Sequence, residues 1–158
     1  MKNIFSKKNL KSSTLSFSKK DVGKDLAERI YTSRLIGSNS ELVLHGGGNT
    51  SVKSKIKNEE GKLVDVIYIK GSGSDLGSID QSGFPAVKLK PLIELVKMDH
   101  ISDEEMMTYL KNNLIDHKSP NPSVETLVHA IINEKYIDHT HSTAILKITD
   151  RPNGKKIC

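Results

Sequence analysis

The sequence predicts an α/β domain, in which helices pack on a small sheet. The first observation is a hairpin pattern, because residues 51–57 and 63–70 flank the turn-forming residues 58–61. The second is helical spacing over residues 102–113, where Ser102 is a suitable N-cap and acidic side chains follow in the first turn. The third is a change from helical spacing at 123–133 to strand-like alternation at 136–141. Helices and strands therefore alternate along the chain.

Length and composition suit one domain with a modest core. A chain of 158 residues can bury a real hydrophobic core. Hydrophobic residues make up 35% of it, but aromatic residues only 4%, and there is no Trp. We therefore expect the core to consist of Leu, Ile and Val side chains.

The net charge of +5 raises the question of nucleic-acid binding. Much of the Lys excess lies in the first 24 residues, and aromatic residues are not interleaved with the basic ones as a base-stacking surface requires. A Lys excess also suits a protein that handles phosphorylated metabolites. We therefore predict no nucleic-acid partner.

Cellular location is inferred from cysteine usage and from the apolar runs. The single cysteine, Cys158, indicates a reducing compartment. No apolar stretch has the length of a secretory signal or a membrane span. We expect a cytoplasmic protein without membrane contact. A transit-like leader is the alternative, since residues 1–20 are rich in Lys and Ser and contain no acid.

The chain begins with a segment that is richer in Lys and Ser than the residues after it. Residues 1–20 are expected to form a disordered or loosely docked basic arm. From Asp21, apolar residues spaced by threes and fours predict a packing helix that Gly37 ends. Further along, a short strand is expected at 84–89, a helix at 91–97, and a helix after Ser142.

Two glycine-rich stretches follow short apolar segments. The first is HGGGN at residues 45–49, and the second is KGSGSD at residues 70–75, directly after a predicted strand. Glycines let the backbone turn sharply and approach a ligand, and the amides, hydroxyls and lysine there can hold a phosphate. The alternative is a pair of plain turns, because neither spacing matches a dinucleotide fingerprint or a P-loop.

Residues 119–142 combine a helix start, a carboxylate and histidines. Pro122 and Ser123 predict a helix start, with Glu125 and His129 one turn apart. Its expected apolar stripe is Val124, Leu127, Val128 and Ile131. Strand alternation then places His139 and His141 on one side with Ile137. Two imidazoles at this spacing can ligate one divalent metal, and the alternative is a pair of surface histidines.

Four segments, in this order, resemble the class II aldolase/adducin family. They are LVLHGGGNTSVK (42–53), IKGSGSDL (69–76), PSVETLVH (122–129) and HTHS (139–142). The sequence is most similar to the aldolase half of the bifunctional rhamnulose-phosphate aldolase/alcohol dehydrogenase type. The resemblance implies a three-layer α/β/α domain with a mainly antiparallel sheet over residues 21–158, and symmetric tetramers.

The resemblance also implies a substrate class and roles for particular residues. Glu125 matches the catalytic carboxylate, and His139 and His141 match two of three zinc ligands. The matching phosphate-binding residues are Gly48, Asn49, Ser72, Gly73 and Ser123. The implied reaction is cleavage of a ketose 1-phosphate, such as rhamnulose 1-phosphate, to dihydroxyacetone phosphate and an aldehyde.

The sequence departs from the family pattern at two points. Val124 stands where a second small polar residue is usual. No histidine follows His141, although the third zinc ligand of the family lies several dozen residues further on. We therefore expect a truncated domain, without its C-terminal part, that binds zinc weakly and has low activity alone. The alternatives are a non-catalytic adducin-like interaction domain and a sugar-phosphate epimerase or dehydratase.

Overall fold

The centre of the fold is an antiparallel sheet, described here from a computed structural model that covers residues 3–18, 23–58, 60–98 and 100–157. Its strand order is β3-β2-β1-β4. The hairpin of β1 (Asn49–Lys57) and β2 (Leu63–Ile69) is confirmed. On its two sides, β3 (Ala86–Lys88) pairs with β2, and β4 (Tyr136–His139) pairs with β1.

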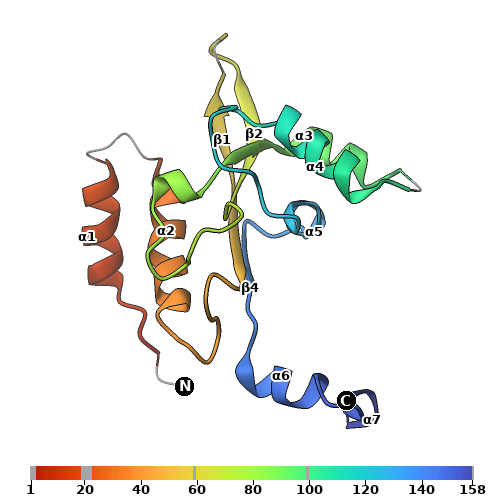
Figure 1. The fold of residues 1–158 in the computed structure, drawn as a ribbon. Helices are drawn as coiled ribbons and strands as arrows, with labels where there is room; N and C mark the ends of the chain where they lie inside the picture. The colour runs from red at the N-terminus through yellow and green to blue at the C-terminus, as the bar shows by residue number, and fades with distance from the viewer. Residues whose placement is uncertain (1–2, 19–22, 59, 99, 158) are drawn as a thin grey trace.

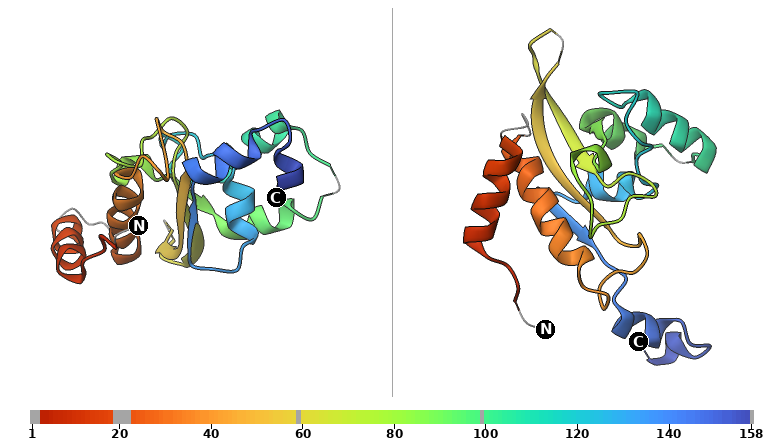
Figure 2. Two further views of the ribbon diagram at one scale, coloured as in Figure 1. Left: turned by 90° about the horizontal axis from the view of Figure 1, so that it is seen from below. Right: turned by 60° about the vertical axis from the view of Figure 1, so that its left-hand side comes forward.

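Helices cover both faces of the sheet (Figure 1). On one face lie α1 (Lys7–Ser18) and α2 (Lys24–Gly37), with the short 3₁₀ helix η1 (Gln81–Gly83) near α2. On the other lie α3 (Leu89–Leu95), α4 (Asp103–Asn112) and α5 (Thr126–Ile131). The turned views separate the three layers (Figure 2). The expected α/β/α arrangement with an antiparallel sheet is confirmed.

Two hydrophobic clusters fill the spaces between the layers, as alternation along a strand requires. Ile67 of β2 joins a cluster with α3, α4 and α5, while its neighbour Tyr68 packs on the cluster beneath α2. The α2 cluster consists of Phe17, Leu26, Ala27, Ile30, Val43, Leu76, Ile79 and Phe84. The cluster on the other face consists of Ile67, Val87, Leu92, Leu110, Leu114 and Ala130. As expected, aliphatic side chains dominate both.

The N-terminal segment differs from the expectation of a disordered or loosely docked arm. Residues 7–18 form α1, and Phe17 is buried in the cluster beneath α2. Its ring lies under the Arg34 guanidinium, 5.7 Å from ring centroid to Cζ, and Phe5 contacts Tyr31 edge to face. These two aromatic side chains hold a segment that is otherwise rich in Lys and Ser. The expected boundary at residues 20–21 lies outside the described residues.

Most predicted helices form near their predicted bounds. The capping box at the start of α4 is present, since Ser102 and Glu105 bond each other's backbone N–H groups. The helix expected at 91–97 begins earlier and forms α3. After β4, α6 (Thr143–Thr149) and α7 (Gly154–Ile157) extend away from the sheet (Figure 1). Among the described residues, no helix has the length and apolar composition needed to cross a bilayer.

Candidate functional site

The candidate site lies where β1 begins and β4 ends, on the face that α5 covers. The register pairs Asn49 with His139 and Ser51 with Ile137, and paired residues share a face. Ser51 bonds His129 of α5, so this is the α5 face. The other face carries Tyr136 and Asp138, which contact α2. The predicted alternation along residues 136–139 is confirmed.

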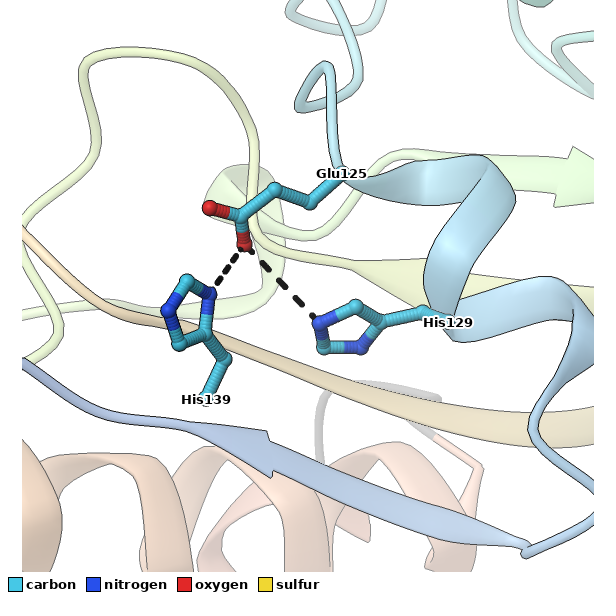
Figure 3. Close-up of side chains that lie close together, drawn as sticks. All are labelled: Glu125, His129 and His139. Carbon is cyan, nitrogen blue, oxygen red and sulfur yellow. Dashed lines mark hydrogen bonds and ion pairs between the residues drawn. The ribbon is translucent and has the colours of Figure 1, made fainter. Parts of the chain in front are cut away.

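Glu125 and His139 meet directly at this end of the sheet (Figure 3). Glu125 Oε2 lies 2.7 Å from His139 Nδ1. Glu125 is the residue directly before α5, and both side chains are partly exposed, so solvent can reach them. A carboxylate and an imidazole at this distance can share a proton or ligate one metal ion.

His129 is a third member of the group, which the sequence analysis assigned to the helix rather than to the metal site. It is only 2% exposed, and its Nδ1 lies 2.8 Å from Ser51 Oγ. That contact leaves Nε2 facing Glu125 Oε2 at 3.9 Å (Figure 3). Burial lowers the pKa of His129 below its ordinary value, although the Glu125 carboxylate opposes this shift. The signal that could have found His129 was its one-turn spacing from Glu125.

The predicted apolar stripe of the 123–133 helix is confirmed only at Leu127, which packs against the hydrophobic cluster on this face, and is wrong at its other three positions. The helix begins at Thr126, and its buried residues are Thr126, His129 and Ala130. Val128 and Ile131 are more than half exposed, as is Val124 before the helix. The physical reason is that the inward face carries the hydrogen bond between His129 and Ser51, together with the packing of Leu127 and Ala130. The spacing of apolar residues alone does not predict a buried polar contact of this kind.

The sequence analysis predicted His141 on the same strand as His139. In the structure it lies beside the group but outside the strand. β4 ends at His139, and the backbone N–H of His141 instead bonds the carbonyl of Leu42. Its ring still approaches that of His139, with ring centroids 4.9 Å apart in an edge-to-face arrangement. His141 therefore adjoins the Glu125–His139 contact from the side of the first glycine turn.

That turn requires glycine at a defined place. Gly46 and Gly48 have φ values of +77° and +69°, which L side chains rarely adopt, and His45 has a φ of 47°. A Cβ on Gly48 would lie 2.9 Å from the His139 carbonyl oxygen. Gly48 therefore lets the turn approach the strand that carries the histidine.

Backbone bonds bring the second glycine stretch beside two other segments of the predicted phosphate site. The N–H of Ser72 bonds the carbonyl of Asn121, and Gly71 pairs with Pro122. Lys70 donates from its backbone to the Thr50 carbonyl and from Nζ to the Gly46 carbonyl, at 2.9 Å.

Within these segments, three predicted phosphate residues have further contacts or geometry of note. Ser123 Oγ accepts from the N–H of Glu125. Gly73 has a φ of +79° and open space around it, while Asn49 is buried. The two glycine stretches thus lie next to each other, at the same end of the sheet as Glu125.

Lys70 is the charged residue at the centre of these segments. It is 5% exposed, and burial lowers the pKa of its ammonium group. The carboxylates of Glu125 and Asp75 oppose that shift in pKa. The sequence analysis included this lysine in the loop but did not single it out.

Arg29 of α2 bonds both β1 and β4 on the α2 face of the sheet. The guanidinium is 1% exposed and donates to the carbonyls of Ser51 and Ile137, one on each strand. It also pairs with Asp138 Oδ1 at 2.6 Å. Burial lowers the pKa of Arg29, and the Asp138 carboxylate opposes the shift. The residue next to Asp138 is His139, so this pair supports the strand that carries the candidate ligand.

The donor atoms of the group fit a divalent metal ion. Glu125, His129 and His139 each offer one nitrogen or oxygen, and these atoms lie within 4.8 Å of one another. Two imidazoles and a carboxylate suit zinc and similar transition metals. The Ser51 contact at the far nitrogen of His129 is the kind of supporting bond that orients metal-binding histidines. A cavity of about 640 Å³ lies elsewhere, on the α2 side near Asp138.

Comparison with known protein families shows which family the chain belongs to. The model described as "Class II Aldolase and Adducin N-terminal domain" matches residues 27–156. The chain belongs to the class II aldolase and adducin family.

Two relatives support this membership. A Bacillus subtilis (strain 168) protein named "Uncharacterized oxidoreductase YuxG" is 45% identical over 134 residues, which cover 85% of this chain but 19% of that protein. The N-terminal class II aldolase domain of a conserved protein from Thermoplasma acidophilum is 44% identical, with a TM-score of 0.76. That match covers 81% of this chain and 60% of the other. The chain thus spans about a fifth of the Bacillus protein.

Proposed function

We propose that the chain acts as a metal-dependent lyase domain that cleaves a ketose 1-phosphate, such as rhamnulose 1-phosphate, into dihydroxyacetone phosphate and an aldehyde. The observation that carries the proposal is the contact of Glu125 with His139, 2.7 Å apart, in a member of the class II aldolase family. His129 and His141 flank this contact and supply further imidazole nitrogens. Such a group joins a proton carrier to metal ligands in one place.

The ligands proposed for zinc are His139 and His141, with His129 as a further nitrogen donor. When bound, the ion would supply Lewis-acid polarisation of the carbonyl and hydroxyl oxygens of the substrate. His139 and His129 are held for this role by β4 and by the Ser51 hydroxyl, respectively.

Glu125 would move the proton. It would accept the proton of the hydroxyl on the carbon that becomes the aldehyde, as the adjacent carbon–carbon bond breaks. It would then return that proton to the carbon that kept the electron pair. No proton is gained or lost overall, and the products are the aldehyde and dihydroxyacetone phosphate. The Glu125 side chain is 31% exposed, so its carboxylate can reach a substrate held outside the sheet.

Gly48, Asn49, Ser72, Gly73 and Ser123 are proposed to bind the phosphate. The backbone bonds between the 70–74 and 120–123 segments support this, because they place residues from distant parts of the sequence together. The Lys70 contact with Gly46 adds the turn that precedes Gly48 and Asn49.

The test is a cleavage assay that detects dihydroxyacetone phosphate, with rhamnulose 1-phosphate and fuculose 1-phosphate as substrates and zinc present. Glu125→Gln keeps the size of the side chain but cannot carry the proton. We expect it to lower turnover by about 100-fold or more, the usual range for general acid–base groups. The matched control is Glu94→Gln, an exposed glutamate on α3, which should leave turnover unchanged.

Three outcomes would replace the proposal. Equal turnover in Glu125→Gln and unmodified protein would exclude Glu125 as the proton carrier. Zinc binding without cleavage of either substrate would favour the non-catalytic interaction domain, which the adducin half of the family description includes. Conversion without release of dihydroxyacetone phosphate would favour an epimerase or dehydratase.

A further inference from the structure

Helix α6 exposes an apolar face that no described residue covers. None of its residues is buried, and Ile145, Leu146 and Ile148 are all exposed. Ile157 of the following helix, α7, is exposed as well. A helix of a folded protein normally buries its apolar side, and adjoining exposed apolar side chains mark surfaces that bind another molecule. The α6 face is therefore a contact surface in need of a partner.

The cavity of about 640 Å³ on the α2 side offers a second apolar surface. It lies between the segment before α1, the end of α2 and residues 38–42, with Asp138 of β4. Its volume falls within the range of roughly 300–1,000 Å³ that is usual for ligand pockets, so it can accept several side chains. The apolar residues that line it are Ile4, Phe5, Leu35, Ile36 and Leu42.

The two surfaces adjoin within one copy of the chain. The backbone N–H of Thr143, at the start of α6, bonds the carbonyl of Glu41, which lines the cavity, at 2.9 Å. The segment before α1 also runs to the end of the molecule at which α6 lies (Figure 1). No residue of α6 is among those that line the cavity, because the helix extends away from the sheet. The helix of one copy therefore does not fill the cavity of that copy.

The two surfaces carry opposite charges. The cavity is lined by the carboxylates of Glu41 and Asp138 and by no Lys or Arg. Asp138 pairs with Arg29, whereas Glu41 forms no ion pair with another described residue. Residues 143–157 contain one acid, Asp150, and four cations, none of which pairs with a described carboxylate. The four cations are Lys147, Arg151, Lys155 and Lys156.

We propose that two copies of the chain exchange α6, so that the helix of each copy packs in the cavity of the other. A two-fold dimer uses the same patch on both copies, and that patch must contain both complementary surfaces. The bond between Thr143 and Glu41 meets this condition because it places them side by side. The interface includes residues 3–5, which precede the range 27–156 that the family model matches, so the family resemblance does not imply it. It is also independent of the proposed lyase activity.

The first test is sedimentation equilibrium of the full chain at about 1–100 μM. We expect a species of twice the 17.5 kDa mass of the chain. Ile145→Asp should raise the Kd of the dimer by about 100-fold or more, because the two-fold axis makes one substitution remove two contacts. The matched control is Ile93→Asp, which changes an exposed isoleucine of α3 on the other face of the sheet and should leave the Kd unchanged. Circular dichroism checks that both variants are folded.

The second test mixes two variants. Ile4→Asp changes an exposed residue of the cavity and should also abolish the dimer. In a mixture, the Ile4→Asp copy has an intact α6 and the Ile145→Asp copy has an intact cavity. One of the two junctions is then complete. We expect a mixed dimer, identified by a tag on one variant, that is weaker than the unmodified dimer and that neither variant forms alone.

The third test concerns the charges. Glu41→Gln should raise the Kd by about 3- to 10-fold and make association less sensitive to salt, since it removes the carboxylate that the basic residues approach. Glu94→Gln, on the other face, is the control and should change neither quantity.

A monomeric unmodified protein over the whole concentration range overturns the proposal and leaves the α6 face for a different partner. An assembly of any size that Ile145→Asp leaves unchanged also overturns it, and loss of association in Ile93→Asp instead would assign the contact to α3. Failure of the mixture to form mixed dimers overturns the exchange of helices. If an aspartate variant does not fold, Ile145→Ser and Ile4→Ser give the same comparison.

Discussion

The Arg29–Asp138 ion pair responds unequally to the loss of one or the other partner. Arg29 is 1% exposed, whereas the Asp138 side chain is 47% exposed. Asp138→Ala leaves a guanidinium group buried with only neutral acceptors: the Ser33 hydroxyl and two carbonyls at 3.3 and 3.4 Å. Breaking a fully buried pair costs about 3–5 kcal/mol, and the exposure of Asp138 lowers our expectation to about 2–3 kcal/mol.

Arg29→Met should cost less, although Arg29 has more contacts. Methionine fills much of the same volume and removes the buried charge. Asp138 can then be hydrated, since about half of its side chain already faces solvent. We expect a loss of about 1 kcal/mol or less in the free energy of unfolding.

Urea unfolding at neutral pH gives both values, provided that the m-value stays constant. The double variant is the control: adding Asp138→Ala to Arg29→Met should cost less than about 0.5 kcal/mol, because no buried charge is left to strand. The reasoning fails if Arg29→Met costs more than Asp138→Ala. It also fails if the two losses simply add.

Three further predictions concern particular residues. Gly48→Ala should lower the free energy of unfolding by about 2 kcal/mol or more in urea unfolding, because a Cβ there would crowd the His139 carbonyl; Gly61→Ala, also at positive φ but with open space, should cost only about 1 kcal/mol. Burial lowers the pKa of His129, so the unfolded state binds more protons below pH 6.5. Thermal unfolding should therefore show that stability decreases as the pH is lowered below that value, and that the decrease is steeper in the unmodified protein than in His129→Gln. Parallel pH profiles of the two proteins would contradict this. Ser102→Ala should cost about 1 kcal/mol through loss of the capping box, and no change in urea midpoint would count against it.

Local patterns predicted the elements of the fold better than their contacts. The hairpin followed from the turn at residues 58–61, and α4 from its capping residues, because both signals act between near neighbours in sequence. The N-terminal helix was missed because its composition is polar, while Phe17 reaches the α2 cluster. A single buried aromatic ring can hold a segment on the domain even when most of its other side chains are exposed and polar. The average composition of the segment does not reveal that ring.

The candidate site was predictable only as a set of motifs. The family resemblance predicted that Glu125 and His139 belong to the site. Their contact, however, depends on where α5 begins and on the register of β4 against β1. His129 was overlooked because its partner, Ser51, is 78 residues away in sequence. Lys70 was likewise not singled out, since its side-chain partner, the Gly46 carbonyl, is 24 residues away in sequence. Tertiary neighbours of this kind leave no periodic signal.

The central claim is tested most directly by the rate of ketose 1-phosphate cleavage as a function of free zinc concentration, in the unmodified protein and in His139→Ala. We predict that chelation abolishes cleavage and zinc restores it. His139→Ala should require at least about 10-fold more zinc for half-maximal rate, since even supporting residues of metal sites cost that much when lost. Cleavage that persists without metal, or the same zinc dependence in both proteins, would contradict the assignment of this group as the metal-dependent lyase site.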